Sequence, residues 1–441
     1  MRFAMVVMLF LFVFTHRGFV GQNDLSRFVG VDSLVNRGVF HVDGSPWAQM
    51  MVERDGGRYH MMCDMVYNHR DGHLYSSKPP VLTILLAGVL KAFTLSGAEF
   101  QFRGPQQAVP TFLLTWLVIG LMTAAAFYAF RRKAGEMLDG AEADVVTLFA
   151  LGGTLFLAYS TTMNHHTFTA ALILISFFLL GMDRSKREIP AARVLIAGCL
   201  MGLAVTVDCG PGFVFSVAFG LYLIAYVGSW RTVALFALGS VPALAMHSVL
   251  QYSLWGSILP VQMMGRGTKS YPGSYWFCKL GSDIWQIPRY RYWLLTLFSA
   301  RGLFVLSPVL LAGFAGLCGA LRKSWPARRA LRSEEAGPGF VALTVLFGMA
   351  VLFFYYSFVA NTNFCGGCFG FRWYIGFTPL LSYYAARYYA GARGQGSFRT
   401  VFYILGLVSL MYALIGMQEP WTLMENNSHP AVRALMLVRG F

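Results

Sequence analysis

Polar residues that could carry chemistry are sparse in this sequence and stand mainly between apolar segments. Asp24 and Arg27 follow the first apolar segment, and Lys78 stands directly before a pair of prolines. A carboxylate can act as a general base, and positioned cationic side chains can stabilise negative charge that develops during a reaction. Asp24 is therefore a candidate base, and Arg27 and Lys78 are candidate anion-binding groups.

Other candidate residues occur in similar positions. Each also has a plain structural interpretation: Asp24 and Asp208 could cap helices, Lys78 could merely precede a helix that starts with proline, and Arg372 could anchor a helix at the membrane surface. An adjacent histidine pair alone does not indicate a metal site, so no metal ligands are assigned. The remaining candidates are Asp64, His73, Tyr75, His165, His166, Arg301 and Arg372.

The two cysteines Cys365 and Cys368 have the spacing of a redox motif. The sequence around them lacks a thioredoxin-like strand–helix pattern, so we discount a redox activity. Whether the pair forms a small-loop disulfide or stays reduced is left open.

The composition indicates an integral membrane protein. Of 441 residues, 56% are hydrophobic and only 12% are charged. The apolar residues come in blocks of about 20, the length that crosses a bilayer as a helix. The net charge of +15 could suggest nucleic-acid binding, but basic residues at helix ends are what orients a polytopic membrane protein. We therefore expect no nucleic-acid partner.

The basic residues predict the topology, because cytoplasmic connections carry an excess of Lys and Arg. If the short apolar segment 79–96 does not cross the membrane, every basic cluster falls on one side. We therefore interpret this segment as an interfacial or re-entrant helix. The fold class is then all-α and polytopic, with roughly eleven transmembrane helices near residues 3–20, 108–130, 145–163, 166–182, 191–207, 211–229, 232–253, 302–321, 339–360, 373–390 and 400–417.

This topology brings the candidate residues to one face of the membrane. We expect a single membrane domain, residues 1–441, with no separate soluble domain. Its N-terminus is cytoplasmic, and its large extracytoplasmic loops are 21–107 and 254–301. Ionisable residues at membrane depth are costly and tend to mark a site. Their convergence predicts one extracytoplasmic cavity.

The order of these features resembles the GT-C membrane glycosyltransferases, in particular the branch of the protein O-mannosyltransferases and the lipid A aminoarabinose transferase (family 39-like). One span is followed by an outer loop that begins with an acidic residue and ends in Tyr75-x-x-Lys78-Pro-Pro. Asp24 and Arg27 match the family's Asp-Glu-x-x-Arg-like motif, with Leu25 in place of the second acid. Asp64 or Asp43 could supply that second carboxylate.

The resemblance implies transfer of a sugar from a polyprenyl-phosphate donor to a glycan, lipid or protein acceptor, by inverting displacement, at the outer face of the cell inner membrane. It implies that Asp24 is the catalytic base. It also implies that Lys78, Arg27, Arg372 and Arg301 bind the donor phosphate, and that substrate contacts come from Asp64, Tyr75, His73, His165 and His166.

Carboxylates and histidines on this face could hold a divalent cation, although no ligand spacing demands one. The alternative function is a polytopic transporter or lipid flippase. Transporters often contain internal repeats and helices broken at the membrane midplane. No repeat is evident here, and the charged residues gather in outer loops.

Overall fold

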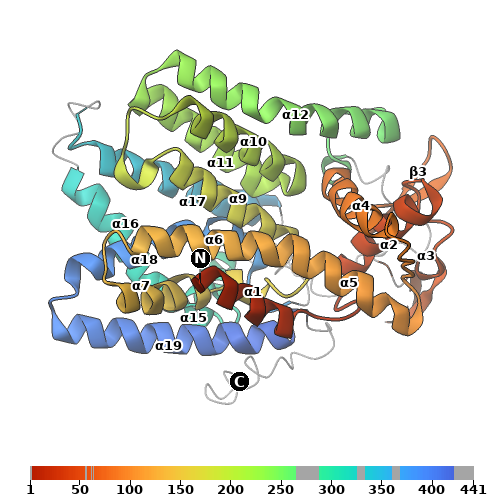
Figure 1. Cartoon of the computed structure of the whole chain (residues 1–441), viewed down its shortest axis with the longest axis horizontal. Helices are drawn as coiled ribbons and strands as arrows, with labels where there is room; N and C mark the ends of the chain where they lie inside the picture. Colours follow the sequence, from red (N-terminus) through yellow and green to blue (C-terminus); the bar gives the residue numbers. More distant parts are fainter. Residues whose placement is uncertain are drawn as a thin grey trace.

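The computed structural model describes residues 2–54, 57–60, 62, 64–264, 288–324, 333–359 and 368–421. Within these residues the chain is a bundle of apolar helices with a small cap of helices and hairpins at one end (Figure 1). The main helices of the bundle are α1 (Arg2–Phe14), α6 (Leu121–Ala134), α9 (His165–Leu179), α10 (Ala191–Val207), α11 (Cys209–Tyr222), α12 (Trp230–Trp255), α16 (Leu310–Ser324), α17 (Gly337–Val359), α18 (Thr378–Ala392) and α19 (Gly396–Gln418).

Five helical segments of the described chain are long and apolar enough to cross a membrane. A bent pair, Arg289–Leu306 with Leu310–Ser324, adds a sixth if it is one span. Several other predicted spans are shorter apolar helices, such as α1 and α9. The polytopic, helical class is thus confirmed, whereas the number of about eleven spans stays a prediction. The five segments are Gly104–Ala134, Cys209–Val227, Trp230–Trp255, Gly337–Phe358 and Gly396–Gln418.

Two predicted spans are interrupted in the structure. The segment predicted at 145–163 consists of α7 (Gly140–Thr147), a π-helical turn η3 (Leu148–Gly152) and α8 (Leu155–Ala158). The break falls where α19 comes close, since a Cβ on Gly153 would lie 2.8 Å from the Ser409 side chain. The segment predicted at 302–321 is bent by 100° between α15 (Leu303–Leu306) and α16.

The first predicted outer loop folds into the cap. It contains α2 (Gln22–Arg37), the short α3 (Pro46–Gln49) and α4 (Pro80–Thr94). It also contains two antiparallel hairpins that the sequence analysis did not predict: β1 (Met51–Arg54) with β2 (Gly57–His60), and β3 (Met65–Asn68) with β4 (His73–Ser76). Helices α2 and α4 pack against each other, and a Cβ on Gly30 of α2 would lie 3.4 Å from the Thr83 side chain of α4. Helix α4 corresponds to the segment 79–96, which was predicted to be interfacial or re-entrant. It lies at the cap end of the bundle (Figure 1).

The basic connections meet at the opposite end of the bundle. Lys133 Nζ lies 2.7 Å from Asp183 Oδ2, and Arg184 Nη2 lies 2.7 Å from Glu136 Oε2. Arg393, after α18, forms an ion pair with Glu142 at 3.1 Å. Connections that are far apart in sequence thus share one end, as the distribution of basic residues predicted.

The predicted outer connections share the other end in the same way. The backbone N–H of His16 donates to Thr161 O at 3.1 Å, and Asn68 donates to Leu254 O at 2.7 Å. The backbone N–H of Phe369 donates to Pro420 O at 3.0 Å. This end therefore carries the candidate site residues.

We predict that the cap end faces outward. In a variant without its native cysteines, Ser96→Cys should react with a membrane-impermeant maleimide in intact cells, because Ser96 is exposed beside α4. Gly394→Cys, exposed at the basic end, should react only after the membrane is permeabilised. The reverse labelling pattern would contradict the predicted orientation.

Candidate functional site

A cavity of about 310 Å³ opens at the cap end, between the base of the β3–β4 hairpin and the helices of the bundle. The start of α9, the junction of α10 and α11, the segment 260–263 after α12 and the end of α17 form its other walls. Titratable groups from four separate segments therefore face one small space. The polar or titratable residues that line it are Asp64, Ser77, Lys78, His165, Asp208, Cys209, Tyr355 and Tyr356.

An ion pair between Lys78 and Asp64 lies in this cavity. Lys78 Nζ is 2.9 Å from Asp64 Oδ2, and the two side chains are only 9% and 15% exposed. The β3–β4 hairpin brings them together because Asp64 directly precedes β3 and Lys78 follows β4; the backbone N–H of Ser77 donates to Asp64 O at 2.9 Å. Burial lowers the pKa of Lys78, Asp64 opposes that change, and the nearby Arg27 and Arg372 reinforce it.

Arg27 is a fully buried cation next to the cavity. It lies on α2 and is fully buried, with 0% of its surface exposed. Among the described residues, none accepts a hydrogen bond from its Nε or from either Nη atom. Burial lowers its pKa to about 10, while the charges of Asp64 and Asp208 act in the opposite direction. A buried guanidinium whose N–H donors have no acceptor among the described residues is suited to receive an anionic ligand.

Arg372 is the third cation of this group. It begins the short helix η10 (Arg372–Phe377), and its guanidinium lies 4.4 Å from the centre of the Trp421 ring. Its charge acts on both Lys78 and His165. We call Arg27, Lys78 and Arg372 the cation cluster.

His166 and Asp208 form a second buried pair at the cavity. His166 Nδ1 lies 2.5 Å from Asp208 Oδ2, with both side chains less than a tenth exposed. Asn164 caps α9 by accepting the backbone N–H of His166 at 2.8 Å, which orients this turn. Asp208 stands at the N-cap position of α11, but its side chain makes no cap hydrogen bond to that helix and binds His166 instead.

These residues could also hold a metal ion. The ligand atoms of His165, His166 and Asp208 lie within 4.8 Å of one another. Two imidazole nitrogens and a carboxylate oxygen are ligand types that Zn²⁺ takes. Spacing along the chain does not reveal this group, because Asp208 lies 42 residues from His166.

Asp24 occupies a different position from the cavity residues. Its Oδ1 accepts the backbone N–H groups of Gly21 and Leu25 at 2.8 and 3.0 Å, and its Oδ2 accepts that of Val20 at 2.9 Å. It is 1% exposed and is not among the described residues that line the cavity. Burial raises the pKa of Asp24 to about 6, and the three hydrogen bonds limit that rise. The side chain thus caps the start of α2, and one acceptor position of Oδ2 remains.

The other candidate residues are not among the described residues of the cavity lining. The Tyr75 hydroxyl donates to Asp71 Oδ2 at 2.7 Å, and its ring packs against Trp255. His73 lies on the outer part of the same hairpin, beside Asp43. Arg301 lies between α14 (Arg289–Phe298) and α15.

Cys365 falls outside the described residues, so its pairing with Cys368 stays open.

We predict that Arg27→Met leaves the thermal unfolding midpoint of the ligand-free protein in detergent unchanged or raises it. Methionine removes a buried charge, while Asp64 keeps Lys78 and Asp208 keeps His166 as partners. Replacing buried ion pairs by apolar side chains of similar volume is often neutral or stabilising by roughly 1–4 kcal/mol, and Arg27 has no hydrogen-bonded partner among the described residues that would be left behind. Arg37→Met is the control on the same helix, because Arg37 donates to Ser33 Oγ. A clear drop of the midpoint for Arg27→Met alone would contradict this account.

No family model and no curated protein matches this sequence. Solved structures do match its fold. The oligosaccharyltransferase of Archaeoglobus fulgidus, in complex with Zn and sulfate, aligns with 96% of this chain at 12% identity and a TM-score of 0.51. This chain spans about half of that protein, 53% of its length.

ArnT from Cupriavidus metallidurans also aligns with this chain. Bound to undecaprenyl phosphate, it matches 98% of this chain over 78% of its own length, at 13% identity and a TM-score of 0.47. In the apo state the match covers 95% of this chain and 75% of ArnT, at 14% identity and a TM-score of 0.46. The fold assignment rests on the archaeal enzyme, a member of the GT-C superfamily. The chain therefore has a GT-C-like membrane fold, as the order of its motifs predicted.

Proposed function

We propose that this protein is a membrane glycosyltransferase that transfers a sugar from a polyprenyl-phosphate donor to an acceptor at the extracytoplasmic face. One observation carries the proposal: Arg27 is fully buried without a hydrogen-bond acceptor among the described residues, next to Lys78 and Arg372. A buried cation in that state is costly, and a phosphate oxygen supplies the acceptors and the opposite charge.

The position of the cation cluster suits a lipid phosphate. Arg27 lies on α2 and Lys78 directly precedes α4, two helices at the cap end of a bundle in which at least five helical segments of the described chain are long and apolar enough to span a membrane. A lipid-linked phosphate remains at the membrane boundary while its chain stays in the bilayer. ArnT from Cupriavidus metallidurans, which aligns with nearly the whole of this chain, has a solved structure with undecaprenyl phosphate bound. That ligand is a lipid-linked phosphate, the chemical class proposed here.

The cation cluster would also contribute to catalysis. As the bond between the sugar and the phosphate breaks, negative charge grows on the leaving phosphate. Lys78 and Arg27 would stabilise that charge most strongly in the transition state, which is what accelerates the reaction. Direct attack by the acceptor on the anomeric carbon inverts its configuration, and the acceptor's proton passes to a base.

Asp24 is the proposed base. Its carboxylate is held rigidly by backbone N–H groups, and burial places its pKa at about 6, close to neutrality. Such a group is ionised at neutral pH and still accepts a proton readily. Asp64 is the competing candidate, because it lines the cavity, but its carboxylate already neutralises Lys78.

We predict that Lys78→Ala lowers sugar transfer by about 10²–10³-fold, the loss typical when one donor to a developing anion is removed. The measurement is transfer from radiolabelled polyprenyl-phosphate sugars in membranes. Lys91→Ala is the matched control, since Lys91 is an exposed lysine on α4. Transfer that is unchanged in Lys78→Ala would remove Lys78 from the mechanism. Undetectable transfer by the wild-type protein across several donors would contradict the proposed function.

We predict that Asp24→Asn lowers the rate of transfer by about 10²–10⁴-fold, the usual contribution of a general base, while binding of polyprenyl phosphate is retained. The wild-type rate should rise with pH through about 6, because the base acts in its deprotonated form. This limb of the pH profile should be absent in the variant. If Asp24→Asn keeps both the rate and the limb while Asp64→Asn loses them, Asp64 is the base.

A further inference from the structure

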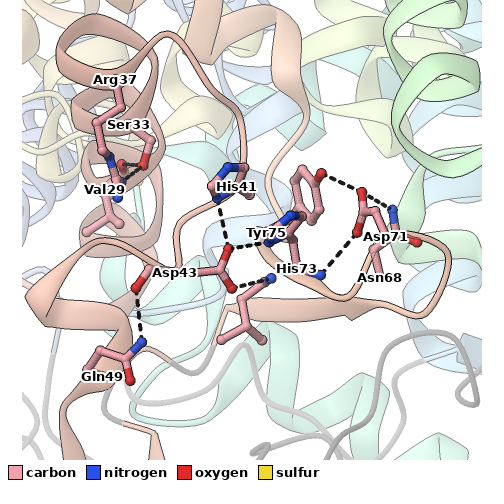
Figure 2. Close-up of polar contacts among 11 residues, drawn as sticks. Val29, Ser33, Arg37, His41, Asp43, Gln49, Asn68, Asp71, His73 and Tyr75 are labelled. Carbon is pink, nitrogen blue, oxygen red and sulfur yellow. Dashed lines mark hydrogen bonds and ion pairs between the residues drawn. The ribbon is translucent and has the colours of Figure 1, made fainter.

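A second group of metal-ligand side chains lies in the cap and consists of His41, Asp43 and His73 (Figure 2). None of the three is among the described residues that line the cavity. His41 Nδ1 and His73 Nδ1 both approach the same oxygen, Asp43 Oδ2, at 2.8 and 3.1 Å. The two imidazole rings are stacked with their centres 4.3 Å apart. Ligand atoms of all three residues lie within 4.8 Å of one another.

The backbone holds these three side chains in place before any ligand binds. His41 forms a β-bridge with Tyr75, and the N–H of Val42 donates to Leu74 O at 2.7 Å. The second carboxylate oxygen of Asp43 accepts the N–H of Leu74 at 2.9 Å, which orients the first toward the histidines. Gln49 donates to the backbone oxygen of Asp43 at 2.9 Å (Figure 2). Outer hydrogen bonds of this kind are what fix the ligands of metal sites.

We propose that His41, Asp43 and His73 form a site for a divalent transition-metal ion such as Zn²⁺, with water in the fourth position. In a tetrahedral zinc site with bonds of about 2.0–2.2 Å, neighbouring ligand atoms are roughly 3.3 Å apart. The two observed nitrogen–oxygen distances need to lengthen by only a few tenths of an ångström. The three side chains are 30%, 31% and 45% exposed, so an ion and its water can reach them.

The bound ion would fasten one end of the β3–β4 hairpin. His73 is the first residue of β4, whereas His41 and Asp43 belong to the segment that pairs with this strand. The other end of the hairpin carries Asp64 and Lys78. Metal binding therefore stabilises the element that positions this ion pair. The site itself does not depend on the proposed transferase activity.

The test uses the full-length protein in detergent and Zn²⁺ as the probe, with the bound metal counted after gel filtration. His166→Gln is introduced first, to remove the cavity group of His165, His166 and Asp208 from the count. This protein should bind one equivalent of zinc, and Co²⁺ should give the visible spectrum of a tetrahedral complex. Adding His73→Gln or His41→Gln should weaken binding by more than about 100-fold, since even outer partners of ligands contribute 10–100-fold.

His69→Gln is the matched control, because His69 is an exposed histidine in the turn of the same hairpin. It should retain the bound zinc. A second readout is independent of the metal count: zinc should raise the thermal unfolding midpoint of the His166→Gln protein but not that of the version that also carries His73→Gln. The proposal is overturned if the His166→Gln protein binds no zinc, or if His73→Gln and His41→Gln leave the bound equivalent and its affinity unchanged.

Discussion

The burial of positive charge at one end of the bundle is the constraint on which the rest of the site depends. Arg27 has no exposed surface and Lys78 has little. Removing such groups from water costs several kcal/mol for each ion unless opposite charge and hydrogen bonds compensate. Asp64 compensates Lys78 directly, whereas Arg27 receives only longer-range attraction from Asp64 and Asp208. The folded chain therefore keeps a buried cation without a hydrogen-bond acceptor among its described residues, and the proposed function assigns the donor phosphate as its partner.

The cap holds these charged residues against the bundle. Helix α2 carries Arg27 and is closed at its start by Asp24. The β3–β4 hairpin joins Asp64 to Lys78, and the proline after Lys78 lets α4 begin at once. The bundle contributes Arg372, His165, His166 and Asp208 from the ends of its helices. Each element is short, and their packing against one another sets the positions of the charges.

The apolar blocks and basic clusters of the sequence predict much of the fold, because long runs of hydropathy and loop charge are strong physical signals. Asp64, Lys78 and His165 were predicted to be site residues, and they do meet in one cavity. The β3–β4 hairpin was not predicted, since strands of four residues have almost no periodicity. Its one local signal is Asp71-Gly72 at the turn, where Gly72 has a φ of +79°.

Other features depend on contacts that the sequence does not display. The partner of His166 is Asp208, from another helix, and the hydrogen bonds of Asp24 follow from the local path of residues 20–25. The break at Gly153 lies where α19, which is far away in sequence, comes close. Tertiary packing decides each of these, so patterns along the chain could only suggest the residue types.

The most direct test of the central claim is an experimental structure of the protein with a bound polyprenyl phosphate. The account predicts that the phosphate lies at the cap end, with its oxygens within hydrogen-bond distance of Arg27 and Lys78, and that the lipid chain runs along the bundle. A phosphate bound at the basic end, beside Lys133 and Arg184, with Arg27 still lacking an acceptor, would contradict it.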